Sequence, residues 1–213
     1  EERGVVIHAE GISSAGIAES GMKRFQAINR EKFAEKWAEE LTHQPSPGTP
    51  LKTVDAMRRR GTIFVSDISS PDASRDSGSL RLIALMQLLV EDGWHVAFAP
   101  DDGRADENTI RKLGQWGIEV LARPWVDSIP AWLSSHGHSL HAAILCRHTV
   151  AGQYAPFVRR HAPQAHLIFD TVDLHFLREE RAAIRAGSAP LSRQASTTRD
   201  QELALITAAD TTF

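Results

Sequence analysis

The chain has 213 residues, of which 42% are hydrophobic and 24% charged, and this balance excludes a disordered or fibrous protein. The 24 lysines and arginines and 27 aspartates and glutamates give a formal net charge of −3, so we expect no nucleic-acid partner. A single cysteine, Cys146, excludes an intrachain disulfide and a cysteine metal cluster, and a cytoplasmic location is expected. No apolar run reaches the ~20 residues of a membrane span, and the N-terminus lacks a signal-peptide pattern.

Residues 1–44 form a first region, which we interpret as a strand-helix appendage. The apolar run 5–8 predicts a short strand, and a Gly/Ser-rich loop follows it. The next segment predicts a helix, because Phe33, Trp37 and Leu41 are spaced four apart and make one apolar stripe.

Residues 45–60 predict a linker, because three prolines and a glycine between positions 45 and 50 break any helix. The basic run 58–60 ends it. That run fits a phosphate or membrane-surface patch, or a solvated turn before a strand, and the turn is the favoured interpretation.

From residue 61 to the C-terminus, apolar runs alternate with helical patterns. The predicted strands cover 62–66, 94–99, 118–121, 141–146 and 166–170, and a sixth opens at 211–213. The predicted helices cover 80–90, 106–115, 128–136, 151–161, 174–186 and 196–209. The first helix is apolar almost all round, so we expect it to be deeply packed. The alternation predicts an α/β domain with a doubly wound parallel sheet over residues 61–213, covered on both faces.

The long loop 67–79 follows the first strand. In open α/β sheets, ligands bind beyond the carboxyl ends of the strands, so this loop is predicted to contact a ligand. Gly78 permits close backbone approach, and the hydroxyls of Ser77 and Ser79 with the helix N–H groups suit a phosphate or a sugar hydroxyl. Neither a G-x-G-x-x-G nor a P-loop pattern is present. An alternative, which does not exclude the first, is that Ser77 or Ser79 caps the helix.

The fourth and fifth strands also end in polar residues. Arg147 and His148 follow the fourth, and Asp170, Asp173 and His175 lie at or just after the end of the fifth. Two carboxylates and a histidine at one rim suit hydroxyl binding and proton handling. On these residues alone we favour the alternative, in which Asp173 caps the next helix and His175 is a first-turn surface residue. We expect Cys146 to be a buried strand-end thiol.

Four stretches carry a family resemblance: 63–67 (Ile-Phe-Val-Ser-Asp), 71–72 (Pro-Asp), 76–81 (Asp-Ser-Gly-Ser-Leu-Arg) and 168–180, which holds Asp-x-x-Asp-Leu-His. With them, residues 61–213 resemble the N-terminal half of a GT-B glycosyltransferase of the group-one type, retaining family four. The last stretch is similar to a subset of bacterial surface-polysaccharide transferases.

The resemblance implies that the glycan acceptor binds to this Rossmann-like domain and that the nucleotide-diphosphate sugar binds mainly to a second, C-terminal domain. Ser77, Gly78 and Ser79 look like the glycine loop that faces the donor diphosphate, with Ser-Gly where Gly-Gly is common. Asp173 or His175 looks like the position, usually histidine, that contacts the transferred sugar, and both remain catalytic candidates. The residues expected to bind donor or acceptor at the rim are Asp76, Ser77, Gly78, Ser79, Arg81, Arg147, His148 and Asp170.

Stretches 6–14 and 29–37 are similar to the tail of a family-two GT-A domain, in which a histidine after the last strand can bind a divalent metal. His8 is the candidate for that role in a parent protein. The Asp-x-Asp element of such a domain is not in this sequence, so we predict no metal and no cofactor in this part of the protein. The alternative is a simple docking strand and helix.

Taken together, these features predict the acceptor-side part of a cytoplasmic bacterial glycosyltransferase, soluble or peripheral at the inner membrane. The chain begins without methionine and stops where a strand opens, so we expect a piece of a longer polypeptide, inactive in isolation. The whole enzyme would transfer a hexose to a growing O-antigen or capsule-like polysaccharide. The alternative is a non-catalytic Rossmann-like or flavodoxin-like module that binds a small ligand or a protein.

Overall fold

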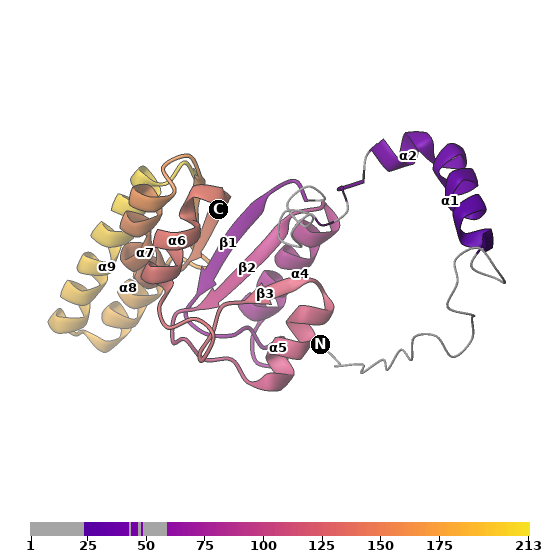
Figure 1. The fold of residues 1–213 in the computed structure, drawn as a ribbon. Coiled ribbons are helices and arrows are strands. Elements are labelled where there is room, and N and C mark those ends of the chain that lie inside the picture. The colour runs from indigo at the N-terminus through magenta and orange to yellow at the C-terminus, as the bar shows by residue number, and fades with distance from the viewer. Residues whose placement is uncertain (1–23, 43, 47, 49–58) are drawn as a thin grey trace. The chain divides into compact units, whose positions relative to one another are not determined.

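The computed structural model describes residues 24–42, 44–46, 48 and 59–213 (Figure 1). The chain divides into two compact units, Glu1–Met57 and Arg58–Phe213. In the first unit, helix α1 (Arg24–Lys36) is followed by the short helix α2 (Ala38–Thr42). The predicted apolar stripe lies on this helical segment and is exposed to solvent. The predicted strand 5–8 and most of the predicted linker lie outside the described residues.

The second unit is built on a six-stranded parallel sheet of order β3-β2-β1-β4-β5-β6. Its strands are β1 (Thr62–Asp67), β2 (His95–Pro100), β3 (Ile118–Val120), β4 (Leu140–Cys146), β5 (His166–Asp170) and β6 (Thr211–Thr212). The predicted doubly wound α/β fold is confirmed. Strand order reverses direction between β1 and β4, and the crevice beyond the carboxyl ends of these two strands is where such sheets bind ligands.

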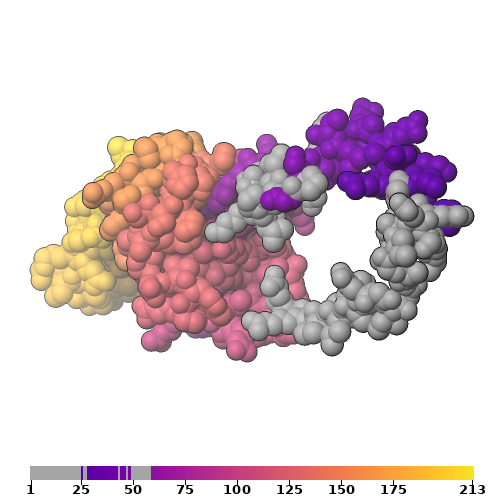
Figure 2. All heavy atoms as spheres, in the orientation of Figure 1, coloured from indigo at the N-terminus to yellow at the C-terminus, as the bar shows by residue number. Residues whose placement is uncertain are grey.

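Helices cover both faces of the sheet, as Figure 1 shows. They are α4 (Ser77–Glu91), α5 (Glu107–Gln115), α6 (Ile129–His136), α7 (His148–His161), α8 (His175–Ala186) and α9 (Ala189–Ala208), with a 3-10 turn η2 (Gly137–Ser139). Neighbouring residues of β1 point to opposite faces because side chains alternate along a strand. Phe64 therefore packs with residues of α6 and α7, whereas Ile63 and Val65 pack with α4 and α5. Helices α8 and α9 form one end of this unit (Figure 2).

Two predicted helices differ from the structure. Helix α4 buries only one side, through Leu82, Ile83 and Met86, so the expectation of deep packing all round is wrong. Its Leu80 and Leu88 lie on the side of the helix turned away from the sheet and are exposed among the described residues.

Helix α9 begins at Ala189, well before the predicted start at 196. Gly187 ends α8 in the left-handed conformation, with φ 58°. Ser188 then precedes α9, and a proline occupies the first turn, where a missing N–H costs nothing. Among the helices that the structure describes, none combines the length and apolarity that a membrane crossing requires.

Candidate functional site

The N-terminus of α4 is fastened by Asp76, which the sequence predicted as a binding residue. The Asp76 carboxylate accepts hydrogen bonds from the backbone N–H and the hydroxyl of Ser79, both at 2.8 Å. These bonds hold the pKa of Asp76 below its ordinary value. The prediction that Ser77 or Ser79 caps this helix is wrong, since Asp76 has the extended backbone and the side-chain oxygen that a cap requires. The Ser79 hydroxyl donates to Asp76 and is therefore already engaged.

Gly78 lies where α4 meets the loops after β4 and β5. A Cβ at this position would lie 3.1 Å from Asp76 Oδ1, 3.4 Å from Val172 Cγ1 and 3.7 Å from Arg147 Nη2. Arg147 and Val172 have positive φ angles of 67° and 62°, and no other non-glycine residue in the described segments does. Positive φ is uncommon for any non-glycine residue and most strained for a β-branched one such as Val172, and it clusters at functional sites. The predicted glycine loop and the two predicted strand ends thus meet in space.

Two buried aspartates anchor arginines at this edge of the sheet. Arg147 Nε donates to Asp67 Oδ1 at 2.9 Å, and Arg81 forms an ion pair with Asp170. Asp67 and Asp170 are buried, whereas the Arg81 side chain is 44% exposed and that of Arg147 23% exposed. Each guanidinium has five N–H donors, so pairing with an aspartate leaves donors for an anionic ligand. Asp67 was not among the predicted binding residues, although it ends the first strand.

Cys146 is buried next to Asp170, as predicted. Its Sγ lies 3.7 Å from Asp170 Oδ2. Burial raises the pKa of the Cys146 thiol well above its ordinary value, and the negative charge of Asp170 raises it further. The thiol is therefore protonated and is not a nucleophile.

A second group of polar residues surrounds the start of α8. The fully buried Glu202 of α9 accepts the backbone N–H groups of His175 at 3.0 Å and Phe176 at 3.2 Å. Glu202 thus accepts the free N–H groups at the start of α8, as a capping side chain would. The alternative in which Asp173 caps α8 is therefore wrong. Asp173 instead binds Arg178 at 2.6 Å.

His175 is not a surface residue, because its side chain is 13% exposed and packs edge-on against His148 at 4.9 Å between ring centroids. Burial lowers the pKa of His148, and the neighbouring His175 lowers it further.

Glu202 is the principal residue that the sequence reasoning missed. It lies 27 positions from His175, and no local motif marks it. A signal was present in the helical spacing of Ala195, Thr198 and Glu202, which puts all three on the buried face of α9.

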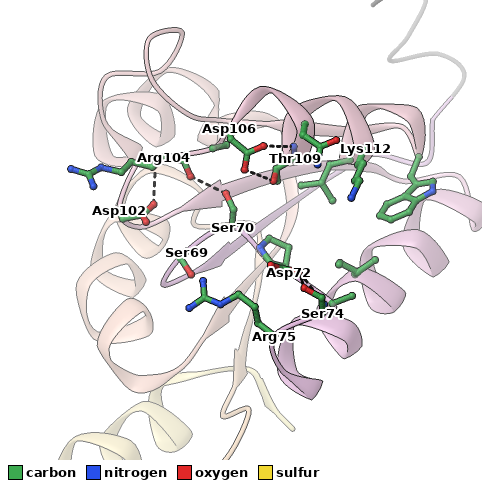
Figure 3. A pocket seen from close by; sticks show the side chains of 17 residues that line it. Ser69, Ser70, Asp72, Ser74, Arg75, Asp102, Arg104, Asp106, Thr109 and Lys112 are labelled. Carbon is green, nitrogen blue, oxygen red and sulfur yellow. Dashed lines mark hydrogen bonds between the residues drawn. The ribbon is translucent and has the colours of Figure 1, made fainter.

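A separate pocket of about 680 Å³ opens between the β1–α4 loop and α5 (Figure 3). Figure 3 shows Asp72, Ser74 and Arg75 facing Thr109 and Lys112 of α5 across it. The apolar residues that line it are Pro71, Ala73, Ile83, Ala105, Leu113 and Trp116. The other polar residues that line it are Ser69, Ser70, Asp102, Arg104, Asp106 and Asn108. The volume falls within the range of small-molecule sites, roughly 300–1,000 Å³. None of the eight predicted donor or acceptor residues lines this pocket. The first part of the predicted loop, residues 69–75, therefore faces the pocket, and the second part, residues 76–79, does not.

No protein-family model matches this chain. A comparison with curated proteins also finds no match. Among solved structures, a mutant O-GlcNAc transferase of Thermobaculum terrenum is similar, with a TM-score of 0.38 and 17% sequence identity. The alignment covers 71% of this chain and 27% of that one. We draw no functional inference from a likeness this loose.

Proposed function

We propose that residues 58–213 are the acceptor-side domain of a glycosyltransferase, which moves a sugar from a nucleotide diphosphate to a glycan. The observation that carries the proposal is the convergence at the β1/β4 crevice. There a Cβ added at Gly78, in the first turn of α4, would lie within 4 Å of the strand-end residues Arg147 and Val172, and two anchored arginines flank the same edge. Parallel α/β sheets bind ligands at this crevice. The resemblance of stretches 76–81 and 168–180 to group-one transferases supports the same conclusion.

The chemistry of this edge suits a leaving diphosphate. The N-terminus of α4 carries partial positive charge, and Arg81 and Arg147 add guanidinium donors whose positions are held by buried carboxylates. Donors held in place before the reaction stabilise developing negative charge without the cost of reorganising. Asp173 and His175, which lie one and three positions after Val172, are then the candidates for contact with the transferred sugar.

The 680 Å³ pocket suits the acceptor. It combines hydroxyl, carboxylate and cationic groups with the aromatic side chain of Trp116, and a sugar site needs hydrogen-bonding groups together with apolar surface. We propose a surface polysaccharide of the O-antigen or capsule type as the acceptor. The donor would be held mainly by a second domain.

The test is sugar transfer by the longer polypeptide that carries both domains. Gly78→Val should lower kcat/KM by about 100-fold, because a displacement of about 1 Å at a positioning loop has that effect. Gly152→Val in α7 is the matched control, since it introduces the same β-branched residue into a helix where a Cβ meets no atom within 4 Å. Circular dichroism should show that both variants are folded. Normal transfer by Gly78→Val would show that the loop is not part of the active site. Absence of transfer by the parent protein with every nucleotide sugar tested would reject the proposal.

A non-catalytic small-ligand module is the second candidate. It is favoured by one observation, namely that the pocket is lined by none of the residues predicted for transfer. Calorimetry with nucleotide sugars and with oligosaccharides distinguishes the two candidates. A non-catalytic module would bind its ligand tightly without a second domain and would catalyse no transfer.

A further inference from the structure

Three helices bring two histidines and a glutamate together beside the carboxyl edge of the sheet. His148 is the first residue of α7, His175 is the first residue of α8, and Glu202 lies within α9. Each offers one potential metal-binding atom, and these three atoms all lie within 4.8 Å of one another. The imidazoles are 13% exposed and the carboxylate is fully buried. Two imidazoles and one carboxylate are a donor set that divalent transition metals such as zinc bind in proteins.

The distances from Glu202 to the two imidazoles are compatible with a shared ion. Glu202 Oε1 lies 3.4 Å from His148 Nδ1 and 3.3 Å from His175 Nδ1. N–H···O bonds are usually about 2.7–3.2 Å long. Ligands at roughly 2.0–2.1 Å from a tetrahedral ion lie about 3.3 Å from each other. The two distances from Glu202 therefore match edges of a tetrahedral site, and the whole set of donor atoms lies within 4.8 Å.

Unpartnered buried atoms are a second, independent observation. The described residues contain four buried side-chain oxygen or nitrogen atoms without a hydrogen-bond partner, and they are His148 Nδ1, Asp173 Oδ1, Glu179 Oε2 and Thr212 Oγ1. The first belongs to the cluster, and the second lies 3.1 Å from His175 Nδ1. Buried polar atoms are almost always hydrogen-bonded, so His148 Nδ1 is open to a further partner, whereas Asp173 Oδ1 is already within ion-pair distance of His175.

The surroundings also hold the carboxylate in place. The backbone N–H groups of His175 and Phe176 donate to the two oxygens of Glu202, and such outer contacts orient metal ligands. His175 Nδ1 also lies 3.1 Å from the Asp173 carbonyl oxygen, which fixes the orientation of the ring.

We propose that His148, His175 and Glu202 form a binding site for one divalent transition-metal ion of the zinc class, with the fourth position left to water. The ion would tie the first turns of α7 and α8 to α9. The metal site shares His175 with the proposed sugar contact, but metal binding is measured without any sugar, so failure of one proposal is distinguishable from failure of the other.

The test uses the whole 213-residue chain after removal of metals with a chelator. Titration with Co²⁺ should give one equivalent with the intense visible bands of tetrahedral coordination, and Zn²⁺ should abolish those bands. Free Zn²⁺ at a hundred times its Kd should raise Tm by about 5–10 °C. A chain that binds neither ion stoichiometrically would overturn the proposal.

Single substitutions locate the site. His148→Ala should weaken Co²⁺ binding by more than about 100-fold, since loss of an outer-shell contact alone costs about 10–100-fold. The Nδ1 atom that this variant removes lies 3.4 Å from Glu202 Oε1, beyond the usual length of a hydrogen bond. Glu202→Gln should also lose binding, although it can weaken the α8 cap as well. His138→Ala, at an exposed position of η2, is the matched control and should bind normally. Stoichiometric binding that survives in His148→Ala would reject the site.

Discussion

Tyr154 shows how one buried hydroxyl joins distant parts of the carboxyl edge. Its ring is buried in the core, and its hydroxyl donates to Asp101 Oδ1 at 2.5 Å, just beyond the end of β2. Gln153 Nε2 donates to the same hydroxyl at 2.9 Å. Burial raises the pKa of Tyr154 far above its ordinary value, and the bond to Asp101 raises it further, so the group remains a neutral donor. Helix α7 is thus tied to the loop after β2.

Removing that hydroxyl should destabilise the domain. Tyr154→Phe keeps the ring in the core but deprives Asp101 of a donor, and a hydrogen bond to a charged group is worth about 1.5–3 kcal/mol. We expect the free energy of unfolding in urea to fall by about that amount. A double-mutant cycle with Asp101→Asn should show coupling between the two positions. Additive losses in that cycle would mean that the bond contributes nothing specific.

At the scale of elements, Asp210 fastens the edge strand β6 to its neighbours. Both oxygens of its carboxylate accept hydrogen bonds from the Arg159 guanidinium of α7 at 2.9 Å, and Oδ2 also accepts the Leu167 backbone N–H at 2.8 Å. A two-residue strand has few ladder bonds of its own, so these contacts specify where it pairs. The bonds to Arg159, followed by that to Leu167, lower the pKa of Asp210 from 3.8 to about 2.

The pKa of Asp210 predicts a pH-dependent contribution to stability. A carboxyl group with a lowered folded pKa stabilises the fold fully above its unfolded pKa and loses that effect as pH falls through the folded value. Asp210→Asn should therefore reduce stability near neutral pH, and its difference from the parent protein should vanish between pH 3.8 and about 2. Urea midpoints measured across this range provide the check. A difference that persists unchanged at the acid end would show that charge on Asp210 is not the cause.

At the scale of the whole molecule, the sheet and all its covering helices belong to the unit Arg58–Phe213. Both core clusters consist of residues from this unit. A unit with its own hydrophobic core is expected to fold independently. We accordingly propose that the boundary between the two units is a domain boundary.

Deletion of residues 1–57 tests that boundary. The shortened protein should unfold cooperatively, with a Tm within about 2 °C of the full chain, because a change of that size corresponds to less than about 1 kcal/mol for a domain of this length. Thermal scans by circular dichroism on both proteins, at equal concentration, make the comparison. A markedly lower Tm for the shortened protein would show that the first unit stabilises the second.

The secondary structure of the second unit was largely predictable, because strands buried on both faces appear as continuous apolar runs between Gly and Pro signals. The helix cap at Asp76 was mistaken for Ser77 or Ser79, since aspartate and serine cap equally well and the sequence alone does not choose the first helical residue. The early start of α9 was missed although Gly187 and the following serine and proline mark it.

The sequence by itself determined the fold class and the edge of the sheet at which ligands are expected, because both depend on periodicity and on the order of strands and helices. Only the tertiary structure decided which side chains meet at that edge. Arg147 and Asp67 are 80 positions apart, and Glu202 reaches the start of α8 from another helix. Such pairs leave no local pattern, since hydrogen bonds and ion pairs depend on distances in space that chain spacing does not specify.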